Sequence, residues 1–361
     1  LHETGPNNYG ISLEATVDAS GTNGSGGLID IHATGDVYAN ELLAWGGIDG
    51  GDISVIGAAV DFYSAIAYGD AGIGGSVAIT ADNIFLTSYG YSIDVQGETG
   101  GGSIDLYARE TLVLGEDSSL SADTGSSGIG GSIRLYAGDA LVVYGDLSAR
   151  GVDGGGSIYT GTGGYLDLNG IGIDAGTQAG DAGIWTISAP SLVVVNGDEQ
   201  GSLPAGSYYV PPLTTRNIQD GDINNAFATG TNVVLQSADY VQFDDAQIVA
   251  DNASPLSFIV NAEGGIFGNA FSIGSIGGTL DMVFNANASS LNNGNGGINF
   301  SNATLDSNGG NIAMYGQSDP LTGTASGYDS GIELSGSIIS TGGGSLLLRG
   351  RGRDREIPAD Y

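Results

Sequence analysis

The sequence predicts an all-β protein, a parallel β-helix (β-solenoid) whose chain winds into stacked coils of about 24–29 residues. Three observations support this fold. A glycine step recurs along the first half, apolar and polar residues alternate after each step, and two more short apolar runs follow before the next step. Three short strands in a repeat of this length make one coil of such a helix. The steps lie at Gly27, Gly51, Gly75, Gly102, Gly131, Gly156 and Gly183.

The first strand of each coil begins directly after the glycine step. Two residues past the steps stand Ile29, Ile53, Val77, Ile104, Ile133, Ile158 and Trp185. Polar residues lie between these inward positions, as expected for a strand with one buried face. Coils stack at about the ordinary strand spacing of 4.8 Å, so equal positions should form columns. Asp105 should then pair with Arg134 on the outside, and Tyr107 should lie beside Tyr136.

The second and third strands are marked by shorter apolar pairs. The second strands contain Val60/Phe62, Ile84/Leu86, Leu112/Leu114, Leu141/Val143, Leu166/Leu168 and Leu192/Val194. The weaker third strands contain Ile93/Val95, Leu120/Ala122, Leu147/Ala149 and Ile173/Ala175. A sandwich or propeller of hairpins is the rival fold, but four-stranded blades need about 40–45 residues, so the short period favours the solenoid.

The regular pattern breaks in the middle of the chain. Residues 196–230 contain Pro204, Pro211 and Pro212, which cannot donate to a strand ladder, so we expect a linker or a short helical insertion there. Four segments result: coils at 1–195, the insertion at 196–230, coils with longer loops at 231–348, and an Arg-rich tail at 349–361. The later strands are expected to begin at Thr231, Pro255, Thr279, Asn311 and Ser345.

The composition excludes several classes of partner. Eight basic residues oppose 41 acidic ones, for a formal net charge of −33. Nucleic acids need a basic footprint, and anionic lipids are repelled by so acidic a surface, so neither is an expected partner. With no cysteine, the chain has no disulfide, thiolate metal site or Cys nucleophile. No apolar run reaches the 18 residues of a membrane span, so none is expected.

The repeats resemble a known family. The Gly-Gly-Ser-Ile-x-Leu coils, the segment "TTRNIQDGDINNAFATGTNVVLQSADYVQF" and the coil "GIELSGSIISTGGGSLLLRGRG" look like those of filamentous haemagglutinin-like exoproteins. These are large repeat adhesins of Gram-negative bacteria, exported by two-partner secretion. The resemblance implies a right-handed β-helix in an extracellular or cell-surface protein. The Asn-Pro-Asn-Gly motif of the family's export domain is missing here, so the chain would be an interior or carboxy-terminal portion.

Candidate site residues are few and carry weak signals. No catalytic triad can be assembled, no cofactor is expected, and both histidines, His2 and His32, are expected to be ordinary surface residues. Ca²⁺ is the one ion left open, because carboxylates cluster in three short turns. These pairs are Asp49 with Asp52, Asp220 with Asp222, and Asp244 with Asp245. A cluster of arginines breaks the acidic pattern and is a candidate self-association surface, made of Arg349, Arg351, Arg353 and Arg355.

These observations predict a non-enzymatic, extracellular structural or adhesive protein. The basic tail could dock on the acidic body of another copy and give head-to-tail filaments, since open solenoid ends template further pairing. Glycans or surface proteins of a host or neighbouring cell are further expected partners. Two alternatives stay open: a carbohydrate-active lyase or hydrolase on the same scaffold, and a Ca²⁺-dependent glycan-binding module.

Overall fold

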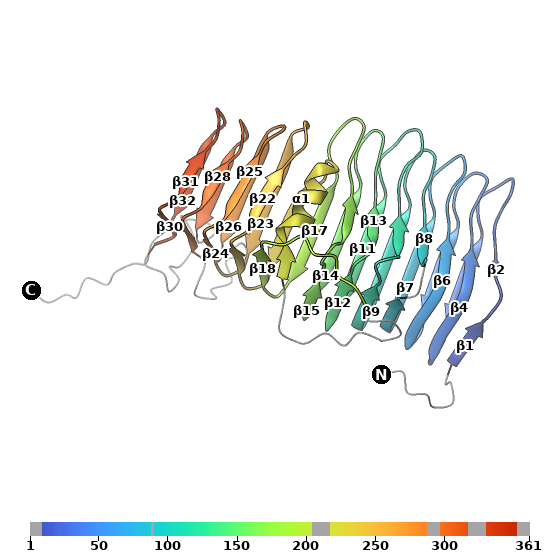
Figure 1. Ribbon diagram of the computed structural model, residues 1–361. Coiled ribbons are helices and arrows are strands. Elements are labelled where there is room, and N and C mark those ends of the chain that lie inside the picture. The colour runs from blue at the N-terminus through green and yellow to red at the C-terminus, as the bar shows by residue number, and fades with distance from the viewer. Residues whose placement is uncertain (1–8, 88–89, 204–216, 287–296, 317–329, 352–361) are drawn as a thin grey trace, which may run out of the picture. The chain divides into compact units, whose positions relative to one another are not determined.

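The computed structural model describes residues 9–87, 90–203, 217–286, 297–316 and 330–351 (Figure 1). The fold is an all-β parallel solenoid of about ten turns, with 56% of residues in strands and, in these ranges, one short helix. The predicted fold class is therefore confirmed. The chain divides into two compact units. Unit 1 comprises Leu1–Ala189 with Asp198–Val233, and unit 2 comprises Pro190–Gly197 with Val234–Tyr361.

Three strand positions recur along unit 1, as the sequence predicts, but neighbouring strands often run on as one. Among the described coils of unit 1, two have three separate strands, β11–β13 and β14–β16. In β7 and β9 the first two strands are joined, and in β4 and β6 the second and third are joined. The elements of unit 1 are β1 (Tyr9–Leu13), β2 (Val17–Asp18), β3 (Leu28–His32), β4 (Asp36–Leu43), β5 (Asp52–Ile56), β6 (Ala59–Ile66), β7 (Ser76–Leu86), β8 (Ser92–Asp94), β9 (Ser103–Leu114), β10 (Ser119–Ser121), β11 (Ser132–Ala137), β12 (Ala140–Val143), β13 (Asp146–Ser148), β14 (Ser157–Thr162), β15 (Tyr165–Asp167), β16 (Gly172–Asp174), β17 (Ile184–Ala189), β19 (Asn217–Gln219) and α1 (Asp220–Ala228).

Equal positions in successive coils lie side by side, as predicted. Ile104 of β9 pairs in parallel register with Ile133 of β11, which pairs with Ile158 of β14, and all three are buried. On the outer face, Arg134 Nη1 lies 3.3 Å from Asp105 Oδ1. The rings of Tyr107 and Tyr136 stack there with centroids 5.5 Å apart. The columns therefore set both the core and the surface of unit 1.

One inward column of apolar side chains contains a threonine, and a tryptophan in the next coil accounts for its presence. Thr160 is fully buried in β14, in the column that otherwise carries leucine, isoleucine and valine. Trp185 of the next coil donates from Nε1 to Thr160 Oγ1 at 3.1 Å. The hydroxyl thus supplies the acceptor that a buried indole N–H needs.

Each glycine step is required by the close approach of consecutive coils. A Cβ on Gly75 would overlap the carbonyl oxygen of Gly51 in the preceding coil. Gly75 N–H donates to the carbonyl of Ala67 at 2.7 Å, and Ser76 N–H donates to the carbonyl of Gly51 at 3.0 Å. The step is a tight corner whose backbone groups are used within the protein, which is why no larger residue replaces it.

The insertion predicted between the two sets of coils contains a helix. α1 packs against β16 and buries Ile223, Ala226 and Phe227. The extended residues before it also lie on unit 1: Gln200 Nε2 donates to the carbonyls of Tyr144 and Gly170 at 3.3 and 3.2 Å. The helical insertion is therefore confirmed, although residues 204–216 lie outside the described ranges.

Unit 2 continues the same repeat with an aromatic core. Each of the five predicted strand starts precedes a strand by one residue, and Phe243, Phe258, Phe271, Phe284 and Phe300 are buried. The strands are β18 (Leu192–Val195), β20 (Asn232–Ser237, which contains the unit boundary), β21 (Val241–Asp244), β22 (Gln247–Ala250), β23 (Leu256–Ala262), β24 (Ile266–Asn269), β25 (Ser272–Ser275), β26 (Leu280–Ala286), β27 (Ile298–Ser301), β28 (Thr304–Asp306), β29 (Ile312–Gly316), β30 (Ile332–Ser335), β31 (Ile338–Ser340) and β32 (Leu346–Gly350).

A left-handed residue makes one corner of every coil in unit 2. Asp245, Ala270, Asn302 and Gly336 each follow the second strand of their coil and have φ of 51°, 53°, 53° and 61°. Only glycine adopts this conformation without cost, and Asn and Asp tolerate it better than other residues. The second residue of the Asp244–Asp245 pair is thus a corner of the chain.

Candidate functional site

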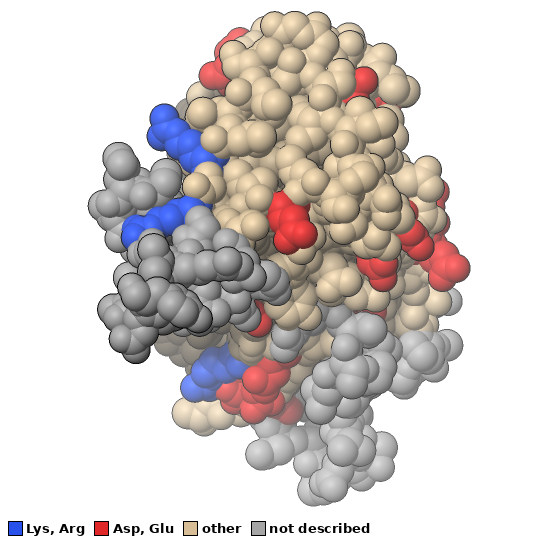
Figure 2. Space-filling view, turned by 90° about the vertical axis from the view of Figure 1, so that its left-hand side faces the viewer, with Lys and Arg blue, Asp and Glu red and all other residues tan. Residues whose placement is uncertain are grey.

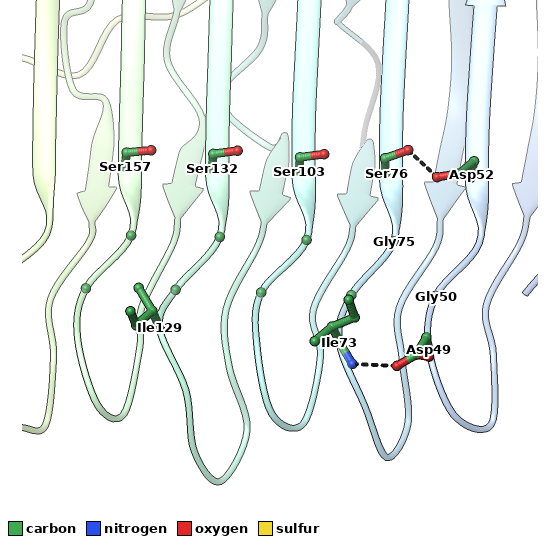
Figure 3. Close-up of a pocket in the computed structure, with 17 residues that line it drawn as sticks. Asp49, Gly50, Asp52, Ile73, Gly75, Ser76, Ser103, Ile129, Ser132 and Ser157 are labelled. Carbon is green, nitrogen blue, oxygen red and sulfur yellow. Dashed lines mark hydrogen bonds between the residues drawn. The ribbon is translucent and has the colours of Figure 1, made fainter. Parts of the chain in front are cut away.

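A shallow groove crosses five coils of unit 1, at the corner where each glycine step leads into a first strand (Figure 3). Its volume is about 780 Å³. We call it the corner groove. It is lined by Asp49, Gly50, Asp52, Ile73, Gly74, Gly75, Ser76, Gly101, Gly102, Ser103, Ile129, Gly130, Gly131, Ser132, Gly155, Gly156 and Ser157.

One wall of the corner groove is a ladder of serines. Ser76, Ser103, Ser132 and Ser157 are paired in register on neighbouring strands, and their side chains project in the same direction (Figure 3). Ser76 Oγ donates to Asp52 Oδ1 at 2.5 Å. Among the described residues, the other three hydroxyls have no hydrogen-bond partner. The wall therefore presents three unpaired hydroxyls, one per coil, at a spacing of about 4.8 Å.

On the opposite wall, isoleucine and glycine alternate from one coil to the next. Four successive coils contribute Ile73, Gly100, Ile129 and Gly154 in turn. Ile73 is paired with Gly100, and Ile129 is paired with Gly154. The isoleucines are 54% and 63% exposed, whereas Gly100 and Gly154 present no side chain in the coils between. The apolar contacts thus repeat every two coils, or about 10 Å.

The backbone N–H groups along the floor of the groove are used within the protein. Gly74 N–H donates to the carbonyl of Gly100 at 2.9 Å, and Gly101 N–H donates to the carbonyl of Ile129 at 3.2 Å. The serine and isoleucine side chains of the two walls are therefore the main groups that can contact a ligand. No basic residue is among those that line the groove.

Two of the candidate calcium ligands lie at one end of the groove, and each is held by a protein donor. Asp49 Oδ1 accepts the N–H of Ile73 at 3.0 Å, while Asp52 accepts the Ser76 hydroxyl. The two carboxylates lie on opposite sides of the Gly50 position in Figure 3. This arrangement ties each carboxylate to its own wall.

The other acidic pairs lie on different elements. Asp220 and Asp222 begin α1 and are buried, whereas Asp244 and Asp245 follow one another at the end of β21 and are exposed. Across the ranges that the structure describes, no group of three or more His, Asp or Glu residues is arranged to hold a metal ion. The calcium assignment therefore stays a prediction.

Asp222 is the most perturbed acid of the described chain. It is 1% exposed, Oδ1 accepts the N–H of Gly170 at 2.9 Å, and Oδ2 is buried without a partner. Burial raises the pKa of Asp222 to about 7; the Gly170 and Gln219 N–H groups oppose this shift, and the charges of Asp198 and Asp167 add to it. Near neutral pH a large share of this carboxyl is therefore protonated.

Sequence reasoning missed both the serine ladder and a buried tyrosine–aspartate cluster. Tyr144 and Tyr165 donate their hydroxyls to Asp167 Oδ2 at 2.9 and 3.0 Å. The ladder had a visible signal, because serine follows the glycine step in four successive coils from Ser76 to Ser157. The cluster had none, since its members stand at unrelated positions of two coils.

The arginine cluster is described in part. Arg349 lies in β32 and Arg351 follows it, whereas Arg353 and Arg355 lie outside the described residues. Figure 2 views the side on which β30–β32 lie, where arginine side chains line one flank of a largely uncharged surface. His32 is exposed and lies 2.9 Å from Asp30, as expected for a surface histidine.

Comparison with known proteins found no match among protein-family models, curated proteins or solved structures. The parallel β-solenoid is compatible with a β-helix repeat protein, but none of these comparisons supports the resemblance to filamentous haemagglutinin-like exoproteins. No helix within the described ranges is long and apolar enough to cross a membrane.

Proposed function

We propose that the protein is a non-catalytic, adhesive β-solenoid of the cell exterior that holds an extended, uncharged glycan strand in the corner groove. The observation that carries the proposal is the pairing of two walls along five coils of unit 1. One wall has unpaired hydroxyls in three successive coils, and the other has exposed isoleucines in two. Sugar rings present both hydroxyl edges and C–H surfaces, so they can bond to the first wall and pack on the second.

The charge of the chain supports an uncharged ligand. The net charge of −33 produces a negative potential around the protein, and the groove lining contains two carboxylates and no basic residue. Polyuronic acids and sulfated glycans would be repelled, and no guanidinium is present to bind their acidic groups. A neutral polymer meets no such barrier.

The carbohydrate-active alternative requires carboxylates free to act on a glycosidic bond. Glycosidases use a pair of acids that flank the bond, one of them with a raised pKa. Both acids of the corner groove accept hydrogen bonds from the protein, from Ile73 N–H and from the Ser76 hydroxyl. This bonding favours a binding role over a catalytic one. An activity screen that released soluble sugar from neutral or acidic polysaccharides would overturn the non-catalytic part.

A retention assay on insoluble polysaccharides tests the binding function. The full chain is mixed with cellulose, chitin, mannan, de-esterified pectin and alginate, and the unbound fraction is measured. We expect retention on at least one neutral polymer and none on the acidic two. The triple variant Ser103→Ala, Ser132→Ala and Ser157→Ala should be retained less, because it lacks all three unpaired hydroxyls. No retention on any neutral polymer, or equal retention of the variant, would contradict the proposal.

The proposal also includes head-to-tail association through the arginines. Arg349 and Arg351 follow the exposed Leu346–Leu348 of β32, so an apolar edge and a positive charge lie together. Replacing both arginines by Glu should shift large species to smaller ones in sedimentation velocity. The same double change at the exposed Arg109 and Arg150 should not. A distribution unchanged by the first pair would remove the electrostatic part of the assembly.

A further inference from the structure

We infer that the corner groove selects a β-(1→4)-linked, uncharged hexopyranose polymer, a straight ribbon whose repeat is two sugar units. This inference rests on the proposed glycan-binding function and specifies its ligand class. The observation behind it is the difference in period between the two walls. The serine wall repeats once per coil, from Ser76 to Ser157, whereas the isoleucine wall repeats once per two coils.

The one-coil period of the serine wall fixes the shape of the ligand. Ser103, Ser132 and Ser157 lie in register, so their hydroxyls follow a line across the strands at about 4.8 Å intervals. A polymer that bonds to every serine must advance by nearly the same distance per unit, which is close to the rise of one pyranose ring in a fully extended chain. Polymers that curve away after two or three units cannot follow this line.

The two-coil period of the opposite wall fixes the linkage. In a β-(1→4) ribbon, successive rings are turned by about half a revolution, so one edge carries the bulky exocyclic group on every second ring only. Ile73 and Ile129 stand two coils apart, so they can contact the same edge of every second ring, while the coils between them carry only glycine at this position. α-(1→4) and β-(1→3) chains coil instead and do not present this alternation.

Gly154 is less constrained than the glycines of the steps. A Cβ on Gly154 would lie 3.5 Å from Ile129 Cγ1, which is an ordinary contact, and the backbone there is not left-handed. A Cβ on Gly75 would overlap backbone. Because Gly154 is buried beside Ile129, a larger side chain there would press on that isoleucine without overlapping backbone, which gives a direct test of the isoleucine contact.

Calorimetric titration with three hexasaccharides of glucose tests the inference, because cellohexaose, laminarihexaose and maltohexaose differ only in linkage. We expect cellohexaose to bind at least tenfold more tightly than the other two. The double variant Ile73→Ser and Ile129→Ser should weaken cellohexaose binding by about tenfold or more, because each isoleucine that the bound ligand covers contributes appreciably to affinity. Ile276→Ser, a matched change at an isoleucine of unit 2 that is 71% exposed, should leave affinity unchanged.

Gly154→Val should also weaken cellohexaose binding, because the added side chain displaces the adjacent Ile129 from its contact with the ring. Circular dichroism checks that this variant keeps its strand content, and Gly154→Ala provides a smaller step if valine prevents folding. Equal affinity for all three hexasaccharides, or unchanged affinity in either variant, would overturn the inference. Retention on neutral polysaccharide without any hexasaccharide selectivity would leave the proposed function standing and this inference refuted. No binding in either assay would refute both.

Discussion

Asp222→Asn should stabilise unit 1, and the gain should depend on pH in a defined direction. The carboxyl is buried at the start of α1, where Oδ1 accepts the N–H of Gly170 and Oδ2 has no partner. Asparagine has nearly the same shape and keeps the acceptor, but it cannot ionise. The substitution therefore removes the ionisable group and leaves the shape of the side chain and its hydrogen bond largely unchanged.

The size and sign of the effect follow from the shift of the Asp222 pKa. The unfolded carboxyl titrates near 3.8 and the folded one at about 7. Below both values the group is protonated in both states and has no effect. As the pH rises from about 4 to about 7, the unfolded chain releases a proton that the folded chain retains, so stability falls. Each pKa unit corresponds to about 1.4 kcal/mol, which places the total loss on the order of 4 kcal/mol.

Urea denaturation followed by tryptophan fluorescence measures this difference, because both tryptophans, Trp45 and Trp185, lie in unit 1. The variant should match the parent at pH 4 and exceed it increasingly up to about pH 7, with a constant gap above. Asp139→Asn, which removes one exposed carboxylate, controls for the general relief of charge repulsion. A gap that is independent of pH, or a variant less stable than the parent at pH 8, would refute the reasoning.

Three further changes test the packing by denaturant unfolding. Ile133→Ala should destabilise unit 1 by about 2–5 kcal/mol, because it opens a cavity in a fully stacked column, and a loss below about 1 kcal/mol would contradict that packing. Ala270→Gly should stabilise unit 2 by about 0.5–1 kcal/mol, since φ is 53° at this exposed corner, and a lower midpoint would contradict the assigned strain. Trp185→Phe should lower the free energy of unfolding by about 1–3 kcal/mol, because it leaves the Thr160 hydroxyl without its donor. Adding Thr160→Val should recover part of that loss, and no recovery would contradict the role of the hydrogen bond.

The sequence predicts the coils well because one physical rule applies to each of them. Parallel stacking in register places equal positions together, so Ile104 and Ile133 could be paired from the repeat alone. The outer pairs followed from the same rule, as the contact between Asp105 and Arg134 illustrates. Asparagine tolerates the left-handed conformation better than most residues, and Asn302 adopts it at a corner of unit 2.

The candidate site could be predicted only in part, because it depends on which outward positions lack partners. The serine positions were visible in the repeat, but the sequence could not show that Ser76 is paired with Asp52 while Ser103 is not. The two-coil alternation could have been counted, because Ile73 and Ile129 each stand two residues before a glycine step, but only the structure shows that both are exposed along a groove. Asp222 was noted for its acidic neighbour, whereas its burial comes from contacts of the insertion with the coil of β16.

The measurement that tests the corner groove most directly is thiol footprinting with a single introduced cysteine. The chain contains no cysteine, so Ser132→Cys places one thiol in the middle of the serine ladder. With cellohexaose at a concentration that saturates the protein in calorimetry, alkylation of this thiol should slow severalfold, while maltohexaose should have no effect. A thiol introduced at the exposed Ser345 of unit 2 should react equally fast in all cases. Unchanged alkylation at position 132 while cellohexaose is bound would place the glycan elsewhere and contradict the account.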